Sequence, residues 1–242
     1  MPIQILQLES TTSDGVVLKS YVCLPESASH DNPAPAILVA PEWWGAAAHP
    51  QKVTERLAEA GFAAVAMDVY GEGKLTTDAA QANEWMSQML ADQDMLMARC
   101  KLIMDDFTDL EAVDKNRLGA IGFCFGGKIV LDMAREGFPL KAVATFHGNP
   151  DPKQPAQKGK FTAKVLVAHG EADSMVSMDA IEGLKKELDN ADVEYTVDVY
   201  EGAKHGFTNP NADKRAEENG VDLGYDADAA CLLYTSDAAD ER

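Results

Sequence analysis

Short stretches dominated by apolar residues alternate with longer amphipathic stretches along this chain. The apolar stretches predict strands, several of them buried on both faces; they occupy residues 16–24, 35–40, 62–67, 118–121, 141–146, 164–168 and 194–200. The amphipathic stretches have helical spacing; they occupy residues 50–60, 128–135, 179–188 and, as two helices with a break, 78–110. Strands that alternate with helices predict an α/β fold with a mostly parallel, doubly wound sheet and helices on both faces.

One domain accounts for most of the 242 residues. We expect residues 1–230 to form it, because the chain shows no internal repeat or low-complexity linker, and the Pro- and Lys-rich residues 151–160 indicate a surface loop. Residues 231–242 can be written in codons that resemble a transposon-library sequencing adapter. We therefore interpret them as a non-native tail. The helix that begins near residue 225 is then expected to be truncated.

Charge and cysteine usage limit the possible partners. The formal net charge is −19 at pH 7, which argues against a nucleic-acid or anionic-membrane partner. No apolar run is long enough for a membrane span and no signal peptide is recognisable, so we expect a cytoplasmic protein. Cys23, Cys100, Cys124 and Cys231 have no metal-ligand spacing. We therefore expect no metal and no cofactor.

The segment Gly122-Phe123-Cys124-Phe125-Gly126-Gly127 follows a predicted strand and precedes a predicted helix. This is the setting of a nucleophile elbow, here with Cys in place of Ser. Side chains at Gly122 and Gly126 would collide with the neighbouring strand and helix, and the helix N-terminus would favour negative charge on the sulfur. The motif alone also fits a glycine-rich turn around a buried structural cysteine.

Two further residues favour the nucleophile. Asp173 and His205 each follow a predicted strand, at the sheet edge where open α/β sheets place their sites. Nucleophile, acid and histidine then occur in the order that α/β-hydrolases use. We therefore predict a Cys124–His205–Asp173 triad, with the backbone N–H groups of Phe125 and Trp43 as the oxyanion hole.

With these residues assigned, the chain from about residue 16 to residue 209 resembles the dienelactone hydrolase family of α/β-hydrolases. The resemblance implies that Cys124 is the nucleophile, His205 the base, Asp173 the orienting acid and Glu42 a switch beside the sulfur. The matching segments are Pro41-Glu42-Trp43-Trp44-Gly45, the Gly-Phe-Cys-Phe-Gly-Gly elbow, Gly170-Glu171-Ala172-Asp173 and His205-Gly206-Phe207.

The chain departs from that family where dienelactone hydrolases hold the substrate carboxylate with two arginines. The corresponding residues, 80–85 and 205–209, contain no Arg. Bidentate recognition of a carboxylate by a guanidinium group is therefore not expected there. We do not expect dienelactone itself to be the natural substrate.

The predicted function is hydrolysis of a small ester or lactone through a thioester acyl-enzyme, of the carboxymethylenebutenolidase type. Alternatives are a general carboxylesterase or thioesterase without lactone preference, and a ligand-binding or thiol-sensing protein on the same scaffold. We expect a small-molecule substrate and a monomer or small homo-oligomer. Candidate pocket residues, each of which also fits a core position, are Trp44, Trp85, His147 and Phe207.

Overall fold

The computed structural model describes the backbone of residues 1–235 and the side chains of residues 1–231. Eight strands form one sheet in the order β1-β2-β4-β3-β5-β6-β7-β8. Strands β3 to β8 run parallel to one another, whereas β1–β2 and β2–β4 are antiparallel pairs. The strands are β1 (Ile3–Thr11), β2 (Val17–Pro25), β3 (Ala34–Ala40), β4 (Ala63–Ala66), β5 (Val113–Phe123), β6 (Ala142–Phe146), β7 (Lys164–Gly170) and β8 (Tyr195–Tyr200).

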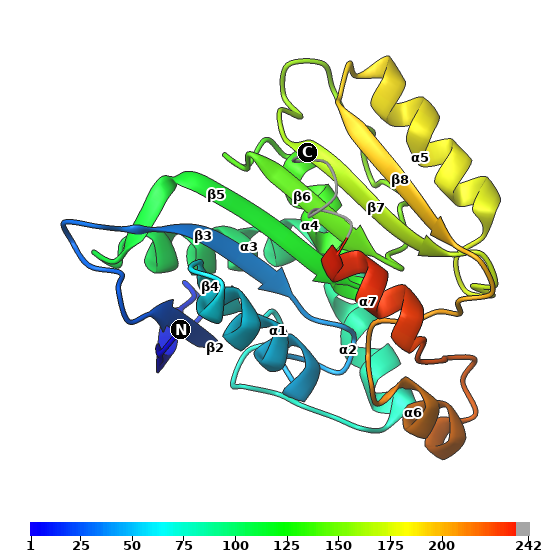
Figure 1. Ribbon diagram of the computed structural model, residues 1–242, viewed down its shortest axis with the longest axis horizontal. Coiled ribbons are helices and arrows are strands. Elements are labelled where there is room, and N and C mark those ends of the chain that lie inside the picture. The colour runs from blue at the N-terminus through cyan, green and yellow to red at the C-terminus, as the bar shows by residue number, and fades with distance from the viewer. Residues whose placement is uncertain (236–242) are drawn as a thin grey trace.

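Helices cover both faces of this sheet, so the mostly parallel, doubly wound α/β fold predicted from the pattern is confirmed. In Figure 1, α1 and α7 lie in front of the sheet and α3 and α4 lie behind it. The helices are α1 (Ala48–Glu59), α2 (Ala79–Ala91), α3 (Gln93–Thr108), α4 (Phe125–Arg135), α5 (Met178–Asn190), α6 (Ala212–Asn219) and α7 (Ala227–Thr235).

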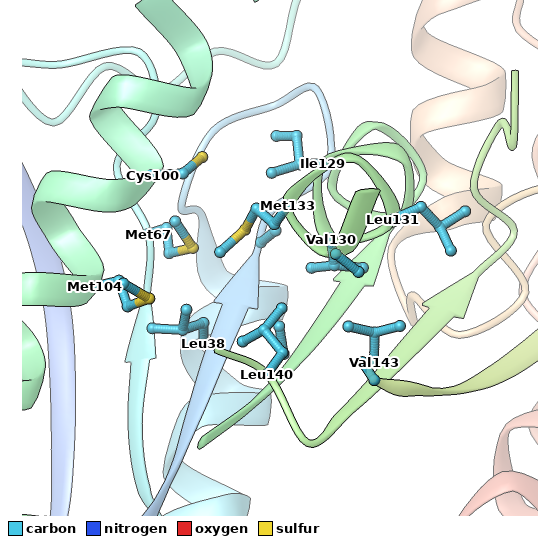
Figure 2. Packing of buried hydrophobic residues seen from close by; sticks show 14 of the residues in the cluster. Leu38, Met67, Cys100, Met104, Ile129, Val130, Leu131, Met133, Leu140 and Val143 are labelled. Carbon is cyan, nitrogen blue, oxygen red and sulfur yellow. The ribbon is translucent and has the colours of Figure 1, made fainter. Parts of the chain in front are cut away.

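Alternation along the strands divides the core between the two faces. Leu38 of β3 belongs to the larger cluster, which includes α3, α4 and α5, whereas Val39 belongs to the smaller cluster with residues of α1 and α7. Figure 2 shows Met67, the residue after β4, packed together with Cys100 of α3 and Met133 of α4 in the larger cluster. This packing fixes α4, and therefore the turn that precedes it, against β3 and β5.

Most predicted elements are present, with shifted ends. The break expected within residues 78–110 is at Asp92, which ends α2 and caps α3 by accepting the N–H of Met95 at 3.0 Å. The helix predicted from residue 128 begins earlier, at Phe125. Two elements were not predicted: the edge strand β1 and the short helix α6.

Helix α7 begins at Ala227, close to the predicted start of a final helix, and continues to Thr235. It therefore extends into the first part of the segment that we interpret as a non-native tail. Residues 236–242 of that segment lie outside the described residues. The assignment of the tail remains a prediction.

Candidate active site

Cys124 occupies the turn between β5 and α4. Its backbone has φ 52° and ψ −113°, a conformation that non-glycine residues rarely adopt. A Cβ atom on Gly122 would meet the carbonyl of Gly126, and one on Gly126 would meet the carbonyl of Ala40 in β3. The two glycines thus allow strand, turn and helix to approach closely, as the sequence analysis predicted, and the N-terminus of α4 lies at Cys124.

Asp173 and His205 lie side by side beyond the ends of β7 and β8. His205 Nδ1 is 2.8 Å from Asp173 Oδ2, and both side chains are buried. Asp173 Oδ1 also accepts the backbone N–H groups of Met175 and Val176, at 2.8 and 3.0 Å. These bonds hold the carboxylate in one orientation, and the carboxylate in turn orients the ring of His205.

Burial and neighbouring groups together set the pKa values of His205 and Asp173. Burial opposes protonation of His205, but the thiolate form of Cys124 and the Asp173 carboxylate outweigh it and raise the pKa of His205 to about 10. Burial also favours the neutral form of Asp173, yet its hydrogen bonds with His205 and the backbone keep its pKa below the ordinary value. The arrangement favours an imidazolium at His205 beside the Asp173 carboxylate.

A cavity of about 200 Å³ joins Cys124 and His205. Larger hollows occur elsewhere on the described surface, but they do not contain these two residues. The cavity at Cys124 and His205 has mostly apolar walls. His205 Nε2 has no hydrogen-bond partner among the described residues. The residues that line the cavity are Trp43, Met86, Leu90, Cys124, Phe125, Lys128, Asn149, Met175, Val176, His205 and Leu223.

The predicted oxyanion-hole residues both line this cavity. Phe125 is the first residue of α4, so its N–H has no partner within that helix. Trp43 follows β3, and its carbonyl accepts the hydroxyl of Tyr70 at 3.0 Å, which fixes the loop at this point. Their placement at one cavity is consistent with two N–H donors near the Cys124 sulfur.

Glu42 is buried beside this cluster, with its carboxylate held by other groups. Asn209 Nδ2 donates to Glu42 Oε2 at 2.7 Å, and His49 Nδ1 lies 3.4 Å from the same oxygen. No hydrogen bond joins Glu42 to Cys124 in the part of the chain that the structure describes. The predicted switch residue is therefore the sequence neighbour of Trp43, which lines the cavity, but its carboxylate is bound to Asn209.

Residues 18–237 match the sequence model of the dienelactone hydrolase family. The chain belongs to the dienelactone hydrolase family. A Yersinia pestis protein assigned as a carboxymethylenebutenolidase is 28% identical over 215 residues, covering 84% of this chain and 78% of the relative. An Aquifex aeolicus protein with the same assignment is 27% identical over 234 residues, 94% of each chain.

Solved structures agree with this assignment. A dienelactone hydrolase-like promiscuous phosphotriesterase from metagenomic libraries is 31% identical, with a TM-score of 0.89 over 98% of this chain and 96% of that one. A structure assigned as a dienelactone hydrolase from Klebsiella pneumoniae has a TM-score of 0.77 at 24% identity, over 99% of this chain and 98% of that one. The protein is thus a hydrolase of this family, which acts on small molecules.

His147 lies behind the dienelactone hydrolase elbow rather than in the cavity wall. It is fully buried, and its Nδ1 accepts the backbone N–H of Cys124 at 3.2 Å. Its Nε2 is therefore the protonated nitrogen and donates to Thr208 Oγ1 at 2.9 Å. Burial first, and then the neighbouring His205, lower the pKa of His147 well below its usual value. A neutral His147 supports the turn that holds the cysteine.

The other three predicted pocket residues also lie outside the cavity lining. Trp44 packs edge-on against Trp43 and is covered by Arg215. Trp85 packs against Tyr70, a layer behind Phe125, and its neighbour Met86 lines the cavity instead. Phe207 is fully buried in the smaller core cluster. Trp44, Trp85 and Phe207 are therefore part of the packing around the cavity and not of its lining.

Three residues near the site were missed by sequence reasoning: Asn209, Thr208 and Lys128. The first two follow the histidine motif, where we noted only that no arginine is present. Lys128 is a solitary lysine on a helix, and no local pattern distinguishes it from a surface charge.

Among the described residues, no group of three or more His, Cys, Asp or Glu side chains is arranged to hold a metal ion. No described helix is long and apolar enough to cross a membrane.

Proposed function

We propose that this protein hydrolyses small esters or lactones with Cys124 as nucleophile, His205 as acid and base, and Asp173 as the orienting acid. The observation that supports it most directly is that Cys124 and His205 line one cavity, while His205 is hydrogen-bonded to Asp173 at 2.8 Å. Each of the three residues follows a different parallel strand. A nucleophile, a base and an orienting group in this relation activate a thiol for attack on a carbonyl.

The reaction begins with Cys124 as thiolate and His205 as imidazolium. The sulfur attacks the ester carbonyl, and the N–H groups of Phe125 and Trp43 stabilise the oxyanion; one such donor is worth about 3 kcal/mol. His205 Nε2 then donates its proton to the departing alkoxide, which leaves a thioester on Cys124. Next, His205 removes a proton from water, the resulting hydroxide attacks the thioester, and the acid product departs as Cys124 thiolate and His205 imidazolium are restored.

Glu42 serves this reaction by staying away from the sulfur. A carboxylate directed at Cys124 would disfavour the thiolate, because like charges raise the cost of ionisation. The hydrogen bond from Asn209 Nδ2 keeps the charge of Glu42 elsewhere. In this proposal the activation of Cys124 depends on whether the Glu42 carboxylate is bound to Asn209 or directed at the sulfur.

The substrate is not dienelactone itself, because residues 80–85 and 205–209 lack the two arginines described above. A general carboxylesterase or thioesterase uses the same residues and differs only in substrate preference. A thiol-sensing protein needs a reactive Cys124 but no oriented base, so the buried hydrogen bond between His205 and Asp173 favours the enzyme. A cytoplasmic location stays a prediction.

A second candidate activity is attack on uncharged phosphotriesters. Its support is the relative described as a promiscuous phosphotriesterase, which is 31% identical to this chain. The mostly apolar cavity wall also suits an uncharged substrate. The same sulfur would then attack phosphorus and release the alkoxide or phenoxide group.

The test is intact-protein mass spectrometry during turnover of a 4-nitrophenyl ester, a small lactone and a 4-nitrophenyl phosphotriester. The wild-type protein is expected to gain an acyl mass that decays as substrate is exhausted, and Cys124→Ala is expected to show neither adduct nor turnover. Cys100→Ala is a matched control, since Cys100 is buried in α3 away from the cavity. Turnover by Cys124→Ala at the wild-type rate would overturn the proposal, and a thiol that reacts without turnover would favour the sensor.

A further inference from the structure

The cavity at Cys124 has two apolar walls on the side where His205 lies. One wall is Met175, in the loop that follows β7, and the other is Leu223, between α6 and α7. The side chain of Met175 is 45% exposed. A large apolar side chain left this open to solvent gains free energy when an apolar ligand covers it. These two walls are therefore candidate contacts for an apolar part of the substrate.

The Met175 wall is placed beside His205 by the Asp173 carboxylate. The backbone N–H of Met175 donates to Asp173 Oδ1 at 2.8 Å, while Asp173 Oδ2 lies 2.8 Å from His205 Nδ1. Val176, which also lines the cavity, donates its backbone N–H to Asp173 Oδ1 at 3.0 Å. One carboxylate thus joins the backbone of this wall to the imidazole ring, and their relative position is fixed.

The Leu223 wall is held at the same histidine by its own neighbours. The backbone N–H of Gly224 donates to the carbonyl of His205 at 3.1 Å. A Cβ atom on Gly206 would lie 3.7 Å from Leu223 Cδ2, so the leucine side chain packs against the backbone just after the histidine. Both ends of the contact therefore keep this wall next to His205.

Asp222 connects the two walls to each other. Its Oδ2 accepts the hydroxyl of Ser174 at 2.7 Å, and its Oδ1 accepts Lys204 Nζ at 2.8 Å. Ser174 precedes Met175 in the chain, and Asp222 precedes the Leu223 wall. The hydrogen bond between Ser174 and Asp222 therefore brings the two walls to neighbouring positions, and the bond to Lys204 joins them to the loop that carries the histidine.

The side of the cavity at His205 is the side of the leaving group. In the proposed reaction His205 Nε2 donates its proton to the departing alkoxide, so the alcohol oxygen must lie within hydrogen-bond reach of that nitrogen. The carbonyl oxygen of the substrate instead points to the N–H groups of Phe125 and Trp43. The groups that follow the alcohol oxygen then lie against the two walls beside His205.

We propose that Met175 and Leu223 bind the alcohol part of the substrate, so that the preferred substrates are esters of apolar alcohols. The equivalent lactones carry an apolar alkyl substituent on the carbon bonded to the ring oxygen. This inference rests on the proposed function. In an ester the alcohol part leaves before water attacks, so these contacts act on formation of the thioester and not on its hydrolysis.

The experiment varies the two halves of the ester separately. The alcohol series is ethyl, butyl and hexyl acetate, and the acyl series is ethyl acetate, butyrate and hexanoate. Butyl acetate and ethyl butyrate are isomers, as are hexyl acetate and ethyl hexanoate, so overall hydrophobicity is matched. The value of kcat/KM is measured by titration of the released acid.

The variants are Met175→Ser, Leu223→Ser and Val199→Ser. Val199 in β8 is 44% exposed, as Met175 is 45% exposed, but it does not line this cavity. Its substitution controls for the loss of an exposed apolar side chain.

In the wild-type protein, kcat/KM is expected to rise about twofold for each methylene added to the alcohol, or about 16-fold from ethyl to hexyl acetate. Full burial of a methylene is worth about fourfold, and these walls are partly open to solvent. Met175→Ser and Leu223→Ser are each expected to lower this hexyl-to-ethyl ratio about threefold or more and to leave the ratio in the acyl series unchanged. Val199→Ser is expected to change neither ratio.

Two results overturn the inference and leave the proposed function intact. One is an alcohol series that is unchanged in both wall variants, and the other is an acyl series that flattens in its place. No hydrolysis of any ester by the wild-type protein overturns the proposed function, and the inference with it.

A second measurement needs no variant, in case the wall variants fail to fold. The acetyl thioester formed from 4-nitrophenyl acetate is attacked by an added alcohol in place of water. The alcohol oxygen bonds to the acetyl carbon, the carbon–sulfur bond breaks, and the alcohol proton passes to His205, which restores the thiolate and the imidazolium.

An alcohol that binds to the two walls is positioned for this attack, because it occupies the site of the leaving group. 1-Hexanol is therefore expected to form hexyl acetate about tenfold faster than equimolar ethanol forms ethyl acetate, as measured by gas chromatography. Equal or slower capture of the acetyl group by 1-hexanol contradicts the inference.

Discussion

Replacing Asn209 with Asp reverses one hydrogen bond in the buried site without changing the size of the side chain. Asn209 Nδ2 donates to Glu42 Oε2 at 2.7 Å, and each residue is only 5% exposed. In Asn209→Asp, two carboxyl groups meet at this place. Two carboxylates at such a distance cannot both remain charged in a buried environment, so the folded variant must bind one additional proton.

The free energy needed to bind that proton at a given pH determines how much the folded variant is destabilised. Each pH unit above the pKa of the accepting group in the unfolded chain costs about 1.4 kcal/mol. An unfolded carboxyl with a pKa of about 4.3 gives a cost of about 4 kcal/mol at pH 7. We therefore expect a deficit of up to about 4 kcal/mol at pH 7. Because the folded variant binds more protons than the unfolded chain, the deficit shrinks as the pH falls toward 5.

Urea denaturation of the wild type, Asn209→Asp and Asn209→Ala at pH 5 and pH 7 measures this. Asn209→Ala removes the donor without adding a charge, so it is expected to lose about 1–3 kcal/mol with a smaller pH dependence. If Asn209→Asp shows the same deficit at both pH values, or none at pH 7, the reasoning about the buried charge on Glu42 is refuted.

Three other experiments examine separate parts of the site. Asp173→Asn is expected to lower kcat for ester hydrolysis by on the order of 10⁴, and a loss below tenfold in steady-state kinetics would argue against an orienting role. An NMR titration of the imidazole protons is expected to place the midpoint of His205 near pH 10, so the ring stays charged below that pH. The midpoint should move toward neutral in Cys124→Ala, and a wild-type midpoint near 6.5 contradicts this. Gly126→Ala is expected to destabilise the protein by about 3 kcal/mol or more in urea denaturation, because the new Cβ would meet backbone atoms. Gly183→Ala in α5, where the space is open, should be neutral or stabilising. Equal effects of the two substitutions would refute the steric argument.

Local patterns were sufficient to predict strands β2 to β8 and the elbow. A strand such as β3, buried on both faces, reads as a continuous apolar run, and the glycines around Cys124 are required by close backbone contacts. The positions of Asp173 and His205 followed from the rule that parallel strands present their following loops at one edge. In each case the information lies within a few consecutive residues.

The missed features depend on residues far apart in the sequence. Asn209 and Glu42 are separated by 167 positions, so no spacing reveals their hydrogen bond. Strand β1 was missed because it pairs with only one neighbour at the sheet edge, and most of its residues remain partly exposed. The pocket prediction assigned Phe207 and Trp85 to the cavity because they are aromatic. Their location depends instead on how the helix or loop that carries each residue packs against the rest of the protein.

Asn209, in a segment where the family has an arginine, has a part in the proposed mechanism. A neutral amide at Asn209 holds Glu42 away from the sulfur without adding a charge, so His205 remains the cationic neighbour of Cys124. If this role of Asn209 is correct, Asn209→Ala should alter the rate of Cys124 alkylation.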